Sequence, residues 1–167
     1  MMKSVKWVVG VLIGITICLA LPYGSGAQGG RQLIVVANDQ SFELASAWVN
    51  FLKNESVSFT RIMPSDFEKY KKEKNIVILG GPTEPDGVGE ILKQALTKEE
   101  QDYMSEEGRF RMYVKNDVWT PGQNVMIFAG SDSKAAAKAR TVSRQKWIAI
   151  FNEWLGIDIS EAGIVAY

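Results

Sequence analysis

Three short, continuous apolar runs constrain the fold of this chain more than any other feature. They span Leu33–Ala37, Ile76–Leu79 and Val125–Ala129. Such runs, rich in β-branched residues and ended by polar residues or glycines, are typical of strands buried on both faces, as in parallel sheets. A further strand is predicted over Val57–Ile62. Because helical patterns follow these strands, the sequence predicts βαβ units with right-handed crossovers and a mainly parallel sheet.

The remaining segments complete the predicted architecture. Ser41 is expected to cap a helix that continues to Lys53, and a short helix is expected over Phe67–Glu73. Further helices are predicted over Val88–Leu96, after the capping-box pattern that begins at Thr97, and from the Ser131–Ser133 segment to Gly156.

One strand differs from the others in its pattern. Phe110–Val114 alternates apolar with polar residues and predicts a half-exposed strand, paired antiparallel with Val125–Ala129. The tail Ile157–Tyr167 is a candidate for one more short strand. We therefore expect an α/β three-layer sandwich of flavodoxin-like type, with one antiparallel edge strand and a hydrophobic signal helix before it.

Residues 1–27 have the three-part pattern of a secretory signal. Lys3 and Lys6 precede the apolar run Trp7–Leu21, and small residues follow up to Ala27. The run is shorter than the roughly 20 residues of a membrane-spanning helix. We expect cleavage after Ala27 and one exported α/β domain over residues 28–167. An uncleaved signal anchor, which would tether the domain to the membrane through residues 7–21, is the alternative.

Two residue types that serve much of enzyme chemistry are missing from the predicted domain. The chain has no histidine, and its one cysteine, Cys18, lies in the apolar run. Ser-His-Asp and Cys-His catalysis and histidine-ligated zinc or haem sites are therefore excluded. Lys and Arg number 19, as do Asp and Glu, so the chain has no net charge. Nucleic-acid binding, which usually needs a large positive field, is not expected.

Polar or glycine-rich segments follow three of the predicted strands: Asn38–Ser41, Gly80–Glu84 and Gly130–Ser133. Ligands usually bind where the carboxyl ends of parallel strands share an edge, and helix N-termini there favour an anion or another small polar group. The candidate ligand-binding residues are Asp39, Gly80, Gly81, Thr83, Glu84, Ser131 and Asp132. A structural interpretation stays open, in which the glycines permit tight turns while Ser41 and Asp132 cap helices.

Acidic residues near the same edge leave two further chemistries open. Oxygen ligands for Ca²⁺ or Mg²⁺ could come from Asp39, Glu84, Asp86, Asp117 and Asp132, although no EF-hand spacing is present. Paired carboxylates also cleave glycosides. Neither pattern is specific, so the sequence predicts no catalytic residue, no metal site and no cofactor.

Two surface features complete the candidate sites. Asn54-Glu55-Ser56 is an acceptor motif for N-glycosylation, with Asn54 as the modified residue. Five cations without an intervening acid follow at Lys134, Lys138, Arg140, Arg144 and Lys146. That stripe could dock on an anionic lipid or polymer, or it could be a solvated helix face.

Two segments resemble the α/β domains of archaeal surface-layer proteins. They are Ile76–Pro82 (IVILGGP) and Asn124–Ala139 (NVMIFAGSDSKAAAKA). The matching positions are Gly80, Gly81, Pro82, Ala129, Gly130, Asp132, Ala136 and Ala139. The resemblance implies an envelope-associated module, although this chain is one small domain rather than a long multi-domain layer protein.

The function expected from the sequence is that of an exported, non-catalytic module that acts by contact at the cell envelope. Its partner would be an envelope or surface protein or a second copy of the chain. Two alternatives stay open. One is an extracytoplasmic domain that binds a small ligand or hydrolyses a substrate with carboxylates at the strand ends. The other is a membrane-tethered accessory subunit.

Overall fold

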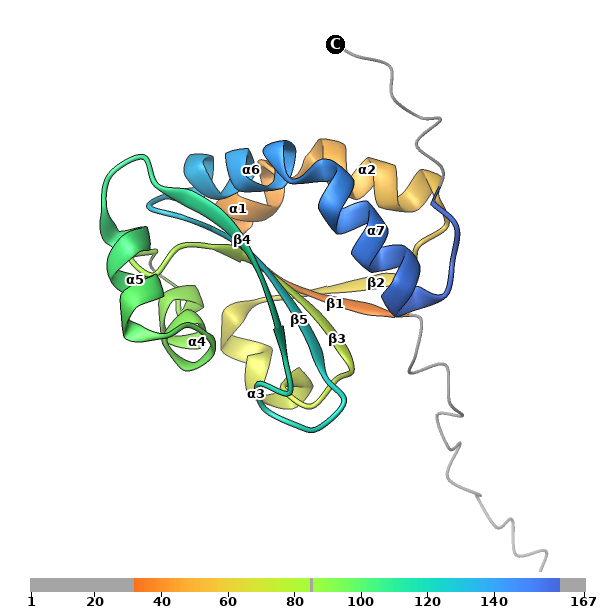
Figure 1. The fold of residues 1–167 in the computed structure, drawn as a ribbon, viewed down its shortest axis with the longest axis horizontal. Helices are drawn as coiled ribbons and strands as arrows, with labels where there is room; N and C mark the ends of the chain where they lie inside the picture. Colours follow the sequence, from red (N-terminus) through yellow and green to blue (C-terminus); the bar gives the residue numbers. More distant parts are fainter. Residues whose placement is uncertain (1–31, 85, 160–167) are drawn as a thin grey trace, which may run out of the picture.

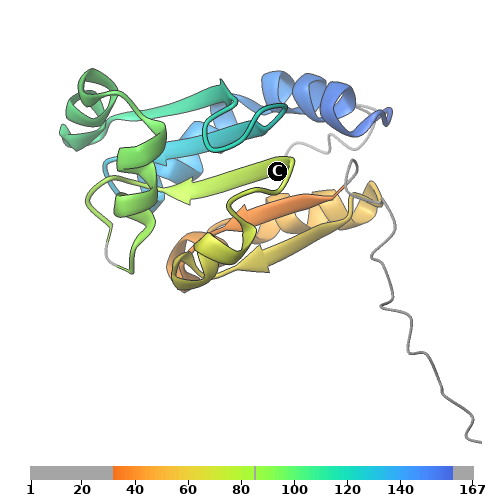
Figure 2. The same ribbon diagram turned by 90° about the horizontal axis from the view of Figure 1, so that it is seen from below.

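The computed structural model describes residues 32–84 and 86–159 of the chain. Its five strands form one sheet in the order β2-β1-β3-β5-β4, which Figure 2 shows from one side. The strands are β1 (Leu33–Val36), β2 (Phe59–Ile62), β3 (Asn75–Gly80), β4 (Phe110–Asn116) and β5 (Asn124–Gly130). β2, β1, β3 and β5 are parallel, whereas β4 is antiparallel to β5. The predicted α/β class and the antiparallel edge strand are therefore confirmed.

Helices cover both faces of the sheet (Figure 1). On one face lie α1 (Asp39–Glu43), α2 (Ser46–Asn54), α6 (Ser133–Val142) and α7 (Arg144–Leu155). On the other lie α3 (Phe67–Tyr70), which follows the 3-10 turn η1 (Pro64–Asp66), and then α4 (Val88–Ala95) and α5 (Lys98–Ser105). No helix in the described ranges is long and apolar enough to span a bilayer.

The alternation of side chains along each strand divides the core into two clusters. Val77 and Leu79 of β3 pack in the cluster under α2, α6 and α7, whereas Ile76 and Ile78 pack in the cluster under α3, α4 and α5. All of β1, β3 and β5 except Asn124 is buried, as expected of central strands covered on both faces.

The prediction of one long helix that ends at Gly156 is wrong in one respect, because the segment forms two helices that meet at Ser143. Ala135, Ala136 and Ala139 are the core-facing residues of α6, and these small side chains allow a close approach to β5. α7 instead buries Trp147 and Phe151, which need more distance from the sheet. A single straight helix would not place both sets of side chains at their packing distances from the sheet, so the helix axis changes direction between α6 and α7.

The helix predicted from Ser41 to Lys53 is also divided, into α1 and α2. Ser41 is not its cap: Asn38 caps α1 by accepting a hydrogen bond from the Ser41 backbone N–H, at 2.7 Å. The Thr97 capping box is confirmed, with the Glu100 side chain closing it. No strand is found over residues 157–159. The rest of the predicted tail strand, and the whole of the predicted signal, lie outside the described residues.

The basic stripe predicted along α6 and α7 is interrupted at Arg140. That side chain is buried, and its guanidinium donates a hydrogen bond to the carbonyl oxygen of Leu44 at 2.7 Å. Burial lowers the pKa of Arg140 to about 10. Lys138 and Arg144 lie over the rings of Phe110 and Phe51. The sequence pattern therefore does not correspond to one continuous cationic face.

The ends of β3 and β5 approach so closely that glycine is required at both. A Cβ on Gly81 would lie 2.0 Å from the carbonyl oxygen of Gly130, and a Cβ on Gly130 would lie 2.2 Å from the backbone nitrogen of Ala136. These contacts bring the start of α6 against the end of β3.

We expect Gly81→Ala to lower the free energy of unfolding by about 3 kcal/mol, the upper end of the range for overpacking, because the clash is with backbone. Gly108→Ala is the control: its Cβ meets nothing within 4 Å, so only its positive φ adds a cost of about 1–2 kcal/mol. Urea unfolding of both variants measures the difference. Equal destabilisation of the two would contradict the close approach.

Candidate functional site

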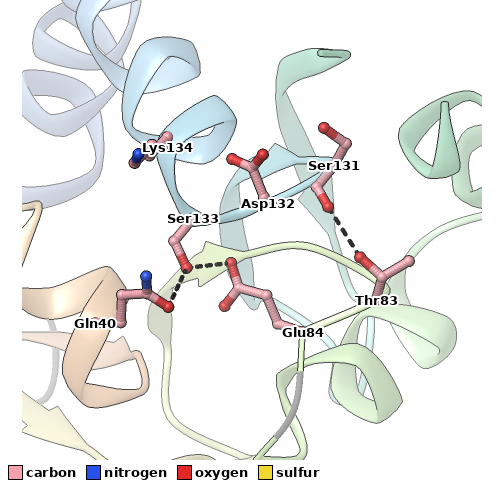
Figure 3. A pocket seen from close by; sticks show the side chains of 7 residues that line it. All are labelled: Gln40, Thr83, Glu84, Ser131, Asp132, Ser133 and Lys134. Atoms are coloured by element: carbon pink, nitrogen blue, oxygen red, sulfur yellow. Dashed lines mark hydrogen bonds between the residues drawn. The ribbon is translucent and has the colours of Figure 1, made fainter. Parts of the chain in front are cut away.

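The three polar segments that follow β1, β3 and β5 meet at one edge of the sheet, as predicted. They surround a pocket of about 350 Å³ (Figure 3). Its lining residues are Gln40, Thr83, Glu84, Ser131, Asp132, Ser133 and Lys134. Gln40 comes from α1, Thr83 and Glu84 from the loop after β3, and the others from the end of β5 and the start of α6.

The Glu84 carboxylate is the point at which the three segments are linked. Its Oε1 accepts a hydrogen bond from the Ser133 hydroxyl at 2.8 Å. Its Oε2 accepts hydrogen bonds from the Asn38 amide at 3.0 Å and the Ser41 hydroxyl at 3.1 Å. Donors from the first and third segments therefore converge on a carboxylate from the second.

Helix capping positions these donors. Asn38 uses its Oδ1 to cap α1, which turns its Nδ2 toward Glu84 and places Ser41 in the first turn of the helix. Asp132 caps α6 by accepting a hydrogen bond from the Ala135 backbone N–H at 2.8 Å. Ser133 is thereby the first residue of α6, with its hydroxyl toward Glu84 (Figure 3).

Burial dominates the electrostatics of this carboxylate. It raises the pKa of Glu84, and the hydrogen bonds from Ser133, Ser41, Asn38 and the Gly81 backbone oppose that shift without cancelling it. None of the ion pairs in the described part of the chain includes Glu84. The carboxylate is thus held by neutral donors alone.

The pocket includes four of the seven predicted ligand-binding residues: Thr83, Glu84, Ser131 and Asp132. Asp39 does not line it, because its exposed carboxylate pairs with Arg61 at 2.5 Å, on the side of the outer strand β2. Gly80 and Gly81 do not line it either. A Cβ on Gly80 would lie 2.8 Å from Glu84 Oε2, so this glycine leaves room for the carboxylate.

The sequence prediction missed Gln40, Ser133 and Lys134 as lining residues. Gln40 and Ser133 are each adjacent in sequence to a predicted residue and belong to the segments expected to meet, whereas Lys134 follows Ser133, just after the third segment. Helix periodicity could have indicated these residues, because it determines which side chains in the first turn of a helix face the ends of the strands.

The other candidate chemistries receive less support from the geometry. Among residues 32–84 and 86–159, no three acidic side chains lie close enough together to hold a metal ion. Asp117 instead accepts a hydrogen bond from the Gly122 backbone N–H within a turn. Asn54 is exposed at the last residue of α2, so its side chain is accessible; its glycosylation remains a prediction.

The chain matches no known protein-family model and no curated protein. The resemblance to surface-layer domains therefore remains a prediction that rests on the two segments that suggested it.

The raised pKa of Glu84 gives a stability prediction with a definite sign. Folding favours its neutral form, so its contribution to stability is greatest at acid pH and falls as pH rises through the folded-state pKa. Gln does not titrate. We therefore expect Glu84→Gln to be less destabilising, relative to the natural protein, at pH 7 than at pH 4.

Urea unfolding at several pH values measures this difference. Glu90→Gln is the control, since Glu90 forms an exposed pair with Lys93 on α4, and its loss should change stability by less than about 1 kcal/mol at any pH. A cost of Glu84→Gln that grows from pH 4 to pH 7 would contradict the assignment.

Proposed function

We propose that this chain is an exported domain that binds a small polar ligand, without covalent chemistry, in the strand-end pocket. The observation that carries the proposal is the convergence of three loops on a part-buried carboxylate that lines a pocket of about 350 Å³. Small-molecule sites are concave and contain a few polar groups in fixed positions, and this pocket has both properties.

The position of the pocket in the fold supports the proposal. The parallel strands run in the order β2-β1-β3-β5, which matches the first four strands of a flavodoxin-like sheet. In open α/β sheets, ligands bind in crevices outside the carboxyl ends of such strands. The pocket lies at that edge, between the starts of α1 and α6.

Binding fits the pocket better than hydrolysis does. A glycosidase-like mechanism needs two carboxylates that are free to act as acid and base. Asp39 is paired with Arg61 outside the pocket, and Asp132 uses Oδ1 to cap α6. Glu84 is then the one lining carboxylate with no structural contact to a helix backbone. The absence of histidine from the sequence removes the usual general base.

Export is the part of the proposal that rests on sequence. Its support is the pattern over residues 1–27, in which two lysines precede an apolar run and small residues follow. The predicted domain contains no cysteine, so its stability comes from packing and needs no particular redox environment.

Contact with an envelope protein is the second candidate, and one observation favours it. β4 ends the sheet, so within the described residues no strand pairs with its outer side. Phe110 and Met112 of this strand are half-buried, and Val114 is 40% exposed. An extended segment of a partner could add to such an edge.

Ligand binding can be tested by nuclear magnetic resonance with a library of small sugars, polyols, amines and carboxylates. We expect at least one chemical class to shift the backbone amide signals of Ser131–Lys134 and Gln40. Thr83→Trp should abolish these shifts by filling the pocket, because Thr83 is an exposed lining residue. Lys72→Trp, at an exposed position away from the pocket, should leave them unchanged. A library that shifts no lining residue would contradict the proposed function.

Export can be tested separately by N-terminal sequencing of the protein recovered from its native host. We expect the mature chain to begin at Gln28 and to be found outside the cytoplasm. A chain that begins at Met1 in the membrane fraction would indicate the anchored alternative. Recovery from the cytoplasm would contradict export in either form.

A further inference from the structure

Glu84 is a part-buried carboxylate that forms no ion pair with a described residue. Seven ion pairs join described residues, and their acids are Asp39, Asp66, Glu68, Glu90, Glu100, Asp102 and Glu106. The donors to Glu84 are a side-chain amide, two hydroxyls and the backbone N–H of Gly81, all of them neutral. Burying a charge without an opposite charge is unfavourable, so this carboxylate is incompletely compensated.

The rest of the pocket lining contains one further carboxylate, Asp132, and one cation, Lys134. Asp132 also forms no ion pair, and only its Oδ1 is engaged, by the Ala135 backbone N–H. Lys134 lines the same pocket, but its ammonium group forms an ion pair with neither carboxylate. Two carboxylates that form no ion pair with a described residue therefore line the pocket.

Hydrogen-bond acceptors also outnumber donors around Ser133. Its single hydroxyl hydrogen has two candidate acceptors, Glu84 Oε1 at 2.8 Å and Gln40 Oε1 at 3.5 Å. The Ser41 hydroxyl hydrogen is shared in the same way between Glu84 Oε2 and the Ser133 oxygen. A ligand that supplies several N–H donors would satisfy acceptors that the protein leaves in excess.

An anion is the least suitable ligand for this arrangement. Helix N-termini at strand ends often hold a bound phosphate or carboxylate. Here Glu84 already occupies the position between the first turns of α1 and α6, where it accepts hydrogen bonds from Ser41 and Ser133. An anionic ligand would face Glu84 and Asp132, and a neutral one would leave both charges uncompensated.

We propose that the strand-end pocket is selective for a small organic cation whose ammonium group pairs with Glu84. This inference rests on the proposed function and specifies the class of ligand. An ammonium group supplies one positive charge, which would pair with Glu84, and three N–H donors for the acceptors around Ser133 and Ser41. Asp132 lines the same pocket and adds to the attraction.

Three probes of equal length test the charge of the ligand: 3-aminopropan-1-ol, propane-1,3-diol and 3-hydroxypropanoate. Each is titrated into the purified protein at pH 7 and low salt while the amide signals of Ser131–Lys134 are followed. We expect the amine to bind at least about tenfold more tightly than the diol, as the added strength of a charged hydrogen bond implies. The anion should not bind, and salt should weaken binding of the amine.

Variants assign the selectivity to particular residues. Glu84→Gln should reduce the preference for the amine over the diol about tenfold. Asp132→Asn should reduce it less and keeps the fold, because Asn caps a helix as well as Asp does. Asp39→Asn is the matched control: it removes a carboxylate from the same sheet edge but outside the pocket, and should leave the preference unchanged.

Each other outcome has a separate meaning. Equal binding of amine and diol, or tighter binding of the anion, would overturn the cation selectivity and leave the binding function intact. The same holds if none of the three probes binds while another compound shifts the lining residues. If no compound of any class shifts those residues, the binding function itself fails. Persistence of the preference in both Glu84→Gln and Asp132→Asn would show that these carboxylates do not determine it.

Discussion

The carboxylate of Glu84 is the contact on which the organisation of the strand ends depends. α1 and α6 both begin at this edge of the sheet, and the positive ends of their dipoles face the same region. Glu84 places a negative charge between them and accepts hydrogen bonds from a residue in the first turn of each helix. One side chain thereby links three loops that are far apart in sequence.

Close backbone packing brings Glu84 to that position. Gly81 and Gly130 allow the ends of β3 and β5 and the start of α6 to approach one another more closely than any side chain would permit. Gly80 leaves the space into which the carboxylate folds back. The glycines thus have the structural role that the sequence left open. In addition, they create the geometry in which a polar pocket forms, so the structural and functional interpretations of this motif are not exclusive.

Sequence patterns predicted the sheet well because the burial of each strand determines where its apolar residues occur in the sequence. The continuous apolar runs gave β1, β3 and β5, and the alternation from Phe110 gave the antiparallel edge strand β4. The breaks at Leu44–Ala45 and Ser143 were missed, since helical periodicity continues across both and only packing distance decides where the axis turns. Within the site, proximity of the three segments was predictable from topology. The exclusion of Asp39 was not, because its partner Arg61 lies on another strand.

The electrostatics of Glu84 favour the proposed binding site over a purely structural link. A carboxylate that served only to join loops would be most stable with a cation beside it or with enough donors to offset its burial. Three neutral side chains and the Gly81 backbone donate to Glu84 instead, and its pKa remains raised. Glutamine could supply a neutral acceptor without the cost of a buried charge. An unfavourable free energy of burial that remains at a side chain facing a pocket is characteristic of functional positions. At such positions the ligand supplies the missing partner.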